Sequence, residues 1–390
     1  SSQGLFFRVG VDWGMFWAAA HAFHISGPDS VYDLRQLGEF VRPLFAYYNP
    51  DMTLLKVNPV PYPPIFLLFL WPFSLFQPVA GFVLWTASNV LAAGYVVVKF
   101  AQRFNLRLRL VIPAVFVTAP LMLGLLVGQP VGLMMVGFYE LYVNLERGED
   151  LRAGLWGGLL LLKPQYAVVL GLVFLLKRRW SAVGGVVIAG AAIAISTLIV
   201  LGPSGTLDFI HSVTGYASGF KQTSFRMAPQ EMISWRGVLV ALMPHLQEVV
   251  GFVATLILTT LTIASLPFIW RGKWNPRGEH FATQVLATMI ITMLVGFDVH
   301  IHGAVLLIIP AIAVFGQHRS RLLHLVLIAA TFLEVPLAVV LANLTGRMLM
   351  ETMALVFAAL QVIALVVIVA PSLRQANRAI DERTALPATS

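Results

Sequence analysis

The chain has 390 residues, of which 58% are hydrophobic and only 11% are charged, and its formal net charge is +8. About a quarter of the residues in an ordinary soluble domain are charged, so this chain has too few charges to cover a water-facing surface. A soluble enzyme, a nucleic-acid binder and a disordered scaffold are therefore excluded as descriptions of the whole chain. The apolar runs do not alternate, which excludes a transmembrane β-barrel. There are no cysteines, so a disulfide or a thiolate metal site is excluded as well.

Apolar runs long enough to cross a bilayer recur along almost the whole chain. They predict an all-α polytopic membrane protein, a single transmembrane domain over residues 1–390 with about eleven or twelve transmembrane helices. The eleven predicted spans are 78–102, 111–127, 130–146, 153–164, 166–176, 180–201, 246–270, 279–296, 301–316, 322–344 and 350–371. The apolar piece Leu67–Phe76 is too short to cross. A further crossing ahead of residue 1 would make twelve.

The segment 153–176 contains Lys163-Pro164-Gln165 in its middle. One straight helix would leave a lone lysine at the bilayer centre, which is costly, whereas Pro164 interrupts a helix. With a break at Pro164, Arg152 falls on the same side as Lys177 and the basic residues after it. The sequence therefore predicts two short arms that meet at Lys163.

The positive-inside rule then places most of the 26 basic residues in short cytoplasmic loops. Two long segments, 12–64 and 202–245, fall on the outer side. The first is predicted to carry an interfacial amphipathic helix, because the N-cap pair Asp29-Ser30 precedes an apolar helical face over 34–45. The second ends in an apolar stretch, Val238–Met243, that could dip back into the bilayer.

In this topology the unusual polar residues gather at the outer ends of the helices, where a lipid-linked phosphate could meet cations while its tail stays in lipid. Asp12 lies among apolar and aromatic residues. Desolvation raises the pKa of a carboxylate and makes it a better general base. The alternative is a carboxylate that pairs with an arginine or caps a helix.

Two cationic residues and one amide are candidate phosphate ligands. Lys163 and Gln165 flank the predicted helix break, where freed N–H groups and an ammonium suit a phosphate; the alternative is a lysine that snorkels. Arg236 follows Trp235 and could bind a phosphate with both arms of its guanidinium. Contact with lipid headgroups explains Arg236 equally well.

Asp298, His300 and His302 resemble a metal-binding set in composition, but zinc sites normally have three or four protein ligands and no second cluster is visible. Structural polar contacts or donation to a phosphate are the favoured roles, and no metal is expected. Gln129, in the tight turn Gly128-Gln129, is predicted as an accessory hydrogen-bond donor. Tyr62, before Pro63-Pro64, is expected to fix the entry of the chain into the membrane.

The order of these motifs resembles a known family. The motifs run from Asp12 through Tyr62-Pro63-Pro64, Gly128-Gln129 and Lys163-Pro164-Gln165 to a loop with Arg236 and a histidine-bearing segment that ends at His302. They are similar to those of bacterial polyprenol-phosphate-sugar-dependent glycosyltransferases of the glycosyltransferase-C superfamily, and most similar to the polyprenol-phosphate-mannose α-mannosyltransferases. The resemblance covers residues 12–302.

The resemblance implies a multi-pass protein of the bacterial cytoplasmic membrane with its site on the extracytoplasmic face. It implies a polyprenyl-phosphate sugar donor, most simply a mannose donor, a lipid or glycan acceptor, contact with membrane lipid, no nucleic acid and no cofactor. The general base of the family falls on Asp12. Donor-binding positions fall on Lys163, Gln165, Arg236 and a histidine at 300 or 302.

From these roles we expect an inverting transfer, with Gln129 and Tyr62 as further donor contacts and Asp298 as the group that orients His300 or His302. Two other classes of function remain open. A transporter or lipid flippase would require polar residues at mid-bilayer and an internal repeat; no repeat is visible, and the polar set lies at one face. A non-catalytic assembly subunit would not require Asp12, Lys163 and Arg236 together.

Overall fold

A computed structural model describes residues 9–32, 35, 37–39, 60–217, 220, 229–317 and 320–384. Across these residues the chain is helical and forms no strand longer than a single bridge, between Met232 and His300. The prediction of an all-α polytopic membrane protein is confirmed. The predicted interfacial helix over 34–45 lies almost entirely outside the described residues. A short helix, α3 (Asp29–Tyr32), does begin at the predicted cap.

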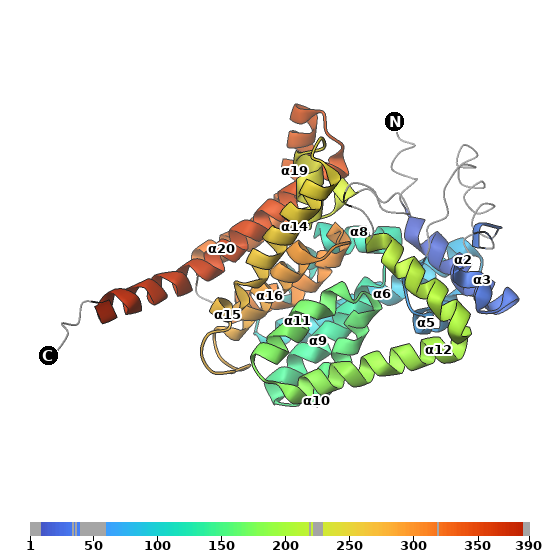
Figure 1. The fold of residues 1–390 in the computed structure, drawn as a ribbon, viewed down its shortest axis with the longest axis horizontal. Coiled ribbons are helices and arrows are strands. Elements are labelled where there is room, and N and C mark those ends of the chain that lie inside the picture. Colours follow the sequence, from blue (N-terminus) through green and yellow to red (C-terminus); the bar gives the residue numbers. More distant parts are fainter. Residues whose placement is uncertain are drawn as a thin grey trace.

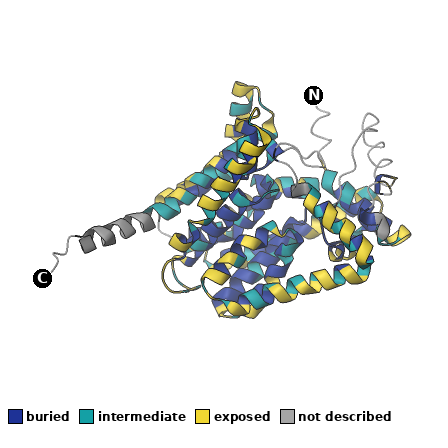
Figure 2. Cartoon of the chain, in the orientation of Figure 1, coloured by how far each residue is buried: buried dark blue, intermediate teal, exposed yellow. Residues whose placement is uncertain are grey.

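Every predicted span is helical, but the helices differ in length and straightness. Among the described residues, four helices are long and apolar enough to cross a membrane: α6 (Pro78–Arg103), the Trp180–Gly215 part of α12 (Trp180–Ala217), the Glu248–Ile269 region, which holds α14 (Glu248–Ile263) and α15 (Leu266–Ile269), and the Leu349–Ala370 part of α20 (Leu349–Thr384). Helices α12 and α14 carry many exposed apolar residues, and the buried residues gather in the centre of the bundle (Figure 2).

Two predicted spans are bent rather than straight. The 111–127 segment forms α7 (Leu108–Phe116) and α8 (Ala119–Val127), which meet at 55°. The 322–344 segment forms α18 (Arg321–Phe332) and α19 (Glu334–Thr345), which meet at 63°. Prolines lie at the starts of α8 and α19, where a missing N–H and a fixed φ favour a new helix over the continuation of the old one. Counted as single spans, the bent pairs raise the number of crossing helices to six.

The remaining apolar segments form shorter helices. They are α5 (Pro64–Ser74), α9 (Val131–Arg147), α10 (Asp150–Gly157), the 3₁₀ helix η2 (Gly158–Leu162), α11 (Gln165–Leu176), α16 (Phe281–Val295), the 3₁₀ helix η4 (Ile301–Leu307) and α17 (Ile308–Gln317). With α6, the helices α9, α11 and α16 form the centre of the bundle (Figure 1).

The helix break at Lys163 is confirmed. Helix α10 continues into η2, Lys163 adopts non-helical angles (φ −128°, ψ 89°), and α11 begins after Pro164. The far ends of the two arms meet, because Nε of Arg179 donates to Asp150 Oδ2 at 2.7 Å. The arms therefore run in opposite directions, as the distribution of basic residues predicts, with Lys163 at their shared tip.

The two predicted outer segments contain ordered helices. In the first, α2 (Val11–Ser26) buries Trp13, Phe16 and Trp17 against α5. In the second, α12 runs past the predicted span end at 201 but is kinked at Gly202, whose φ of 67° is non-helical. The predicted apolar stretch near 238–243 is the short helix α13 (Trp235–Leu242). Residues 218–219 and 221–228 lie outside the described part.

Candidate active site

The start of α2 docks on the turn that follows α8, and this contact positions Asp12. The N–H of Gly10 donates to the carbonyl of Leu126 at 2.6 Å. Gly128 has a φ of 89°, and a Cβ at this residue would lie 2.5 Å from Cβ of Trp13. The turn therefore needs glycine both for its left-handed conformation and for the close approach of α2.

Asp12, Gln129 and Tyr62 form a hydrogen-bonded row. The amide nitrogen of Gln129 donates to Asp12 Oδ2 at 2.6 Å. The hydroxyl of Tyr62 donates to Gln129 Oε1 at 2.8 Å. Tyr62 and Gln129 are buried, whereas Asp12 is only half-buried. The amide of Gln129 therefore positions the carboxylate of Asp12, and the hydroxyl of Tyr62 fixes the orientation of that amide.

Lys163 continues the row. Its ammonium lies over the ring of Tyr62, 5.5 Å from the centroid, and 3.3 Å from Nε2 of His302. Lys163 and His302 are both half-buried. Because Lys163 sits at the tip of the broken segment and His302 in η4, two elements 139 residues apart in sequence meet here.

Asp298 and His300 lie beside His302. Oδ1 of Asp298 is 3.3 Å from Nε2 of His300, and the rings of His300 and His302 stack with centroids 5.8 Å apart and planes 13° apart. The amide of Gln165 donates to the carbonyl of Asp298 at 3.0 Å. Asp298 and His300 precede η4 rather than lying on a helix.

Arg236 is placed differently from the other candidates. It lies at the start of α13 and is 1% exposed. Its Nε donates to the carbonyl of Phe220 at 2.9 Å, and its guanidinium covers the ring of Phe297 at 4.3 Å. The N–H of Ile233 donates to the carbonyl of Val299 at 2.8 Å, which ties the α13 segment to the Asp298–His302 stretch. Arg236 is therefore buried next to the segment that contains Asp298, His300 and His302.

The charged groups of the cluster influence one another. Burial raises the pKa of Asp12, an effect that the hydrogen bond from Gln129 and the charge of Lys163 reduce but do not cancel. For Asp298, burial is outweighed by its contact with His300 and by nearby cations, so the pKa is lowered. That same contact outweighs burial at His300 and raises its pKa.

One residue that the sequence analysis missed is Tyr166, directly after Gln165. The side chain of Tyr166 is 1% exposed. Its hydroxyl lies against Gly303, 2.0 Å from the position that a Cβ on that glycine would occupy. Tyr166 therefore packs on η4 next to His302. The only feature of the sequence that could have identified Tyr166 was its position beside the Lys-Pro-Gln motif. An aromatic residue in an apolar helix is equally expected from ordinary core packing.

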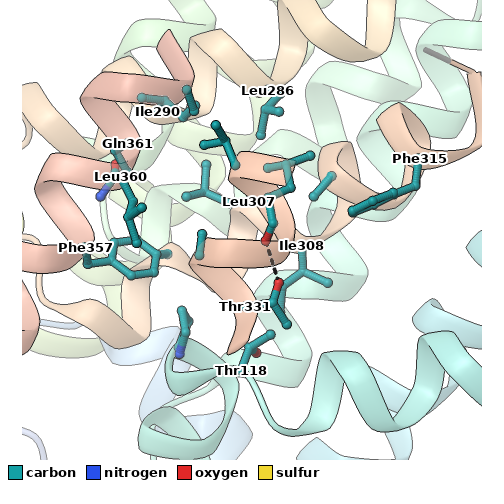
Figure 3. A pocket seen from close by; sticks show the side chains of 17 residues that line it. Thr118, Leu286, Ile290, Leu307, Ile308, Phe315, Thr331, Phe357, Leu360 and Gln361 are labelled. Atoms are coloured by element: carbon teal, nitrogen blue, oxygen red, sulfur yellow. Dashed lines mark hydrogen bonds between the residues drawn. The ribbon is translucent and has the colours of Figure 1, made fainter. Parts of the chain in front are cut away.

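A separate pocket of about 90 Å³ is lined in part by residues of η4 and α17 (Figure 3). Its walls are almost entirely apolar, with Leu286, Leu307, Phe315 and Phe357 among them, and Thr331 donates to a backbone carbonyl within it. It contains none of the candidate residues. Across the described part of the chain, no three His, Asp or Glu side chains are grouped as a metal ion would require.

The fold and the cluster together define a polytopic helical membrane protein with an acid, a lysine and two histidines at one end of its bundle. The family model of glycosyltransferase family 87 matches residues 61–296, more than half of the chain. The chain belongs to this family and is a membrane glycosyltransferase. Comparison with curated proteins gives no match, and comparison with solved structures gives none either.

The matched region includes Tyr62, Gln129, Lys163, Gln165 and Arg236. Four further candidates lie outside it: Asp12, Asp298, His300 and His302. The family assignment favours a transferase over the transporter and flippase alternatives.

Proposed function

We propose that this protein transfers a sugar from a polyprenyl-monophosphate donor to the hydroxyl of a lipid- or glycan-linked acceptor. The simplest candidate for the sugar is mannose. The transfer inverts the configuration at the anomeric carbon and takes place on the extracytoplasmic face of the bacterial cytoplasmic membrane. Membership of glycosyltransferase family 87 and the apolar helices support a transferase that draws its donor from the membrane.

One observation carries this proposal: a continuous row of contacts joins the carboxylate of Asp12 to a lysine and two histidines, and ends at a second carboxylate, Asp298. The row runs from Asp12 through Gln129 and Tyr62 to Lys163, and from Lys163 through His302 to His300 and Asp298. A glycosyl transfer needs a base for the acceptor and positive charge for the leaving phosphate, and the row holds both.

In the proposed reaction, the carboxylate of Asp12 takes the proton of the acceptor hydroxyl while the hydroxyl oxygen bonds to the anomeric carbon. The bond from that carbon to the phosphate oxygen breaks, and its electron pair stays on the polyprenyl phosphate. Lys163 and the adjacent histidines stabilise the charge that develops on the phosphate. Gln165 and Asp298 hold the segment that contains His300 and His302 in place, and the buried guanidinium of Arg236 adds positive charge.

The proposed side of the membrane follows from the ends of the helices. Helices α9, α11 and α16 have the candidate cluster near one end and basic residues near the other, among them Arg147, Arg179 and Arg277. Basic residues concentrate in cytoplasmic loops, which supports an extracytoplasmic location for the cluster. It lies where a phosphate headgroup could reach it from the outer leaflet.

The decisive experiment is Asp12→Asn, which keeps shape and hydrogen bonding but removes the base. We expect transfer of radiolabelled mannose from polyprenyl-phosphate mannose to a lipid acceptor to fall about 10²-fold or more, with donor binding retained. Asp208→Asn is the matched control, because Asp208 is an exposed aspartate on α12. Near-wild-type transfer by folded Asp12→Asn would remove Asp12 as the base.

Donor identity and stereochemistry need separate measurements. Polyprenyl-phosphate mannose should support transfer, whereas a nucleotide-linked mannose should not. A β-linked donor should give an α-linked product, which NMR of the product distinguishes. Transfer from a nucleotide sugar, or retention of configuration, would overturn those parts of the proposal while leaving the family assignment intact.

A further inference from the structure

A polar cavity lies at the opposite end of the bundle from the candidate active site. It has a volume of about 220 Å³ and is bounded by the end of α9, the turn after α11 and the loop that leads into α16. Its lining residues are Leu145, Glu146, Arg147, Gly148, Arg179, Trp274, Asn275, Pro276 and Arg277. Three arginines and one glutamate therefore line it.

The distance between the two sites is set by helix α9, which runs from the Gln129 turn to this cavity. Its 17 residues span about 25 Å, close to the thickness of the hydrocarbon core of a bilayer, about 30 Å. A cavity at this end of α9 therefore lies near the membrane interface opposite the candidate active site.

The acidic groups around the cavity already have partners. Glu146, with a side chain that is 5% exposed, pairs with Arg103 at 2.7 Å. Asp150 pairs with Arg179. Two carbonyls at the end of α9 also accept hydrogen bonds: Arg277 Nε donates to that of Glu146 at 2.8 Å, and the N–H of Gly148 donates to that of Leu145 at 3.1 Å.

The arginines, by contrast, keep donors to spare. The side chain of Arg147 is exposed and forms no hydrogen bond or ion pair within the described part of the chain. Arg277 is exposed and commits only its Nε. A guanidinium carries five N–H donors in a planar fork that matches phosphate. The cavity thus offers positive charge with unused donors, around acids that are already neutralised.

One wall of the cavity is aromatic and rigid. Trp274 stacks on Trp270 with centroids 5.2 Å apart, and the guanidinium of Arg179 lies 5.6 Å from the ring of Trp274. Lys177 donates to the carbonyls of Trp270 and Gly272 at 2.9 and 2.6 Å, which fixes the loop. Tryptophan is typical of the membrane interface, so the wall suits a headgroup whose acyl chains remain in the lipid.

We propose that this basic pocket binds a phosphate group at the inner membrane interface, through Arg147, Arg277 and Arg179. The group is either the phosphodiester of an anionic phospholipid or a free phosphate. The proposal does not depend on the function assigned to the Asp12 cluster, and neither would fail with the other.

The test compares Arg147→Gln with the control Arg152→Gln. Arg152 is 71% exposed, lies on the neighbouring helix and does not line the pocket. Native mass spectrometry would measure binding of phosphatidylglycerol and phosphatidylcholine to each purified protein. We expect the wild type to prefer phosphatidylglycerol, Arg147→Gln to bind it about tenfold more weakly, and Arg152→Gln to match the wild type. Arg147→Lys, which keeps the charge, should recover part of the affinity.

Titration with inorganic phosphate distinguishes the two sources. Displacement of phosphatidylglycerol by millimolar phosphate, but not by chloride at the same ionic strength, would indicate a site for free phosphate. Retention of the lipid would indicate a headgroup site that also needs the acyl chains. Equal binding of the two lipids by the wild type, or equal affinities for Arg147→Gln and Arg152→Gln, would overturn the proposal.

Discussion

Nζ of Lys163 lies 3.3 Å from Nε2 of His302, so a helix break and a 3₁₀ turn from distant parts of the chain share one polar contact. Two positive charges at this distance would repel each other. The contact therefore favours a neutral His302 that accepts from the Lys163 ammonium, in the tautomer with its proton on Nδ1. A phosphate that bound here would meet both an ammonium and an imidazole N–H.

Lys163→Ala should lower both donor binding and turnover, because it removes the positive charge next to the leaving phosphate. We expect a loss in turnover of about 10²-fold, the usual effect of removing one group that stabilises charge in a transition state. Lys99→Ala is the matched control, since Lys99 is an exposed lysine on α6. Binding of polyprenyl-phosphate mannose and initial transfer rates are the measurements. A change confined to turnover would argue against direct phosphate contact.

Gln129→Leu should shift the acid limb of the pH–rate profile to higher pH. The base acts as a carboxylate, so activity falls as the pH drops through the pKa of Asp12. Burial already raises that pKa above its ordinary value of 3.8, and the hydrogen bond from Gln129 lowers it. Without the amide, the charged form loses a donor and the pKa rises further.

The control for this shift is Gln165→Leu, which removes an amide that donates to the carbonyl of Asp298 and not to Asp12. Transfer rates between pH 4 and 8 would be compared, with both variants checked for folding. An acid limb that stays in place in Gln129→Leu would mean that the group that titrates is not Asp12.

The sequence predicted the helices well because the helices of a membrane protein can be recognised by their apolar composition. The break at Lys163 was predictable because only one arrangement put Arg152 and Lys177 on the same side. The bends between α7 and α8 and between α18 and α19 were not predicted. Hydropathy reports how apolar a segment is, whereas a bend depends on where a proline allows a second helix to start.

The candidate site was predictable in its members but not in its contacts. Asp12 and Gln129 are 117 residues apart, and nothing in either local sequence indicates that the start of α2 docks on the Gly128 turn. The burial of Arg236 against Phe297 was not foreseen, because an arginine near a membrane surface has several possible partners. Contacts of this kind depend on the packing of whole helices.

Asp298→Asn should reduce transfer less than Asp12→Asn and should move the basic limb of the pH profile to lower pH. Contact with Asp298 raises the pKa of His300 above its ordinary value of 6.5. If protonated His300 stabilises the leaving phosphate, activity is lost as the pH rises through that pKa. Removing the carboxylate charge lowers the pKa, so the loss begins at lower pH. If the basic limb did not move in Asp298→Asn, protonated His300 would not be the group that stabilises the leaving phosphate.

The docking of α2 can be tested through glycine. Gly128→Ala would place a Cβ 2.5 Å from Cβ of Trp13, at a residue whose φ is 89°, so we expect it to lower the stability by about 1–3 kcal/mol. It should also displace Asp12, so that transfer falls even at temperatures where the variant is folded. Gly94→Ala is the matched control, because Gly94 lies within α6 and has no atom within 4 Å of the position that a Cβ would occupy. There alanine should stabilise the helix by about 0.5–1 kcal/mol. Thermal unfolding in detergent, followed by tryptophan fluorescence, gives the comparison, and similar unfolding temperatures and transfer rates for the two variants would contradict the docking of α2 on this turn.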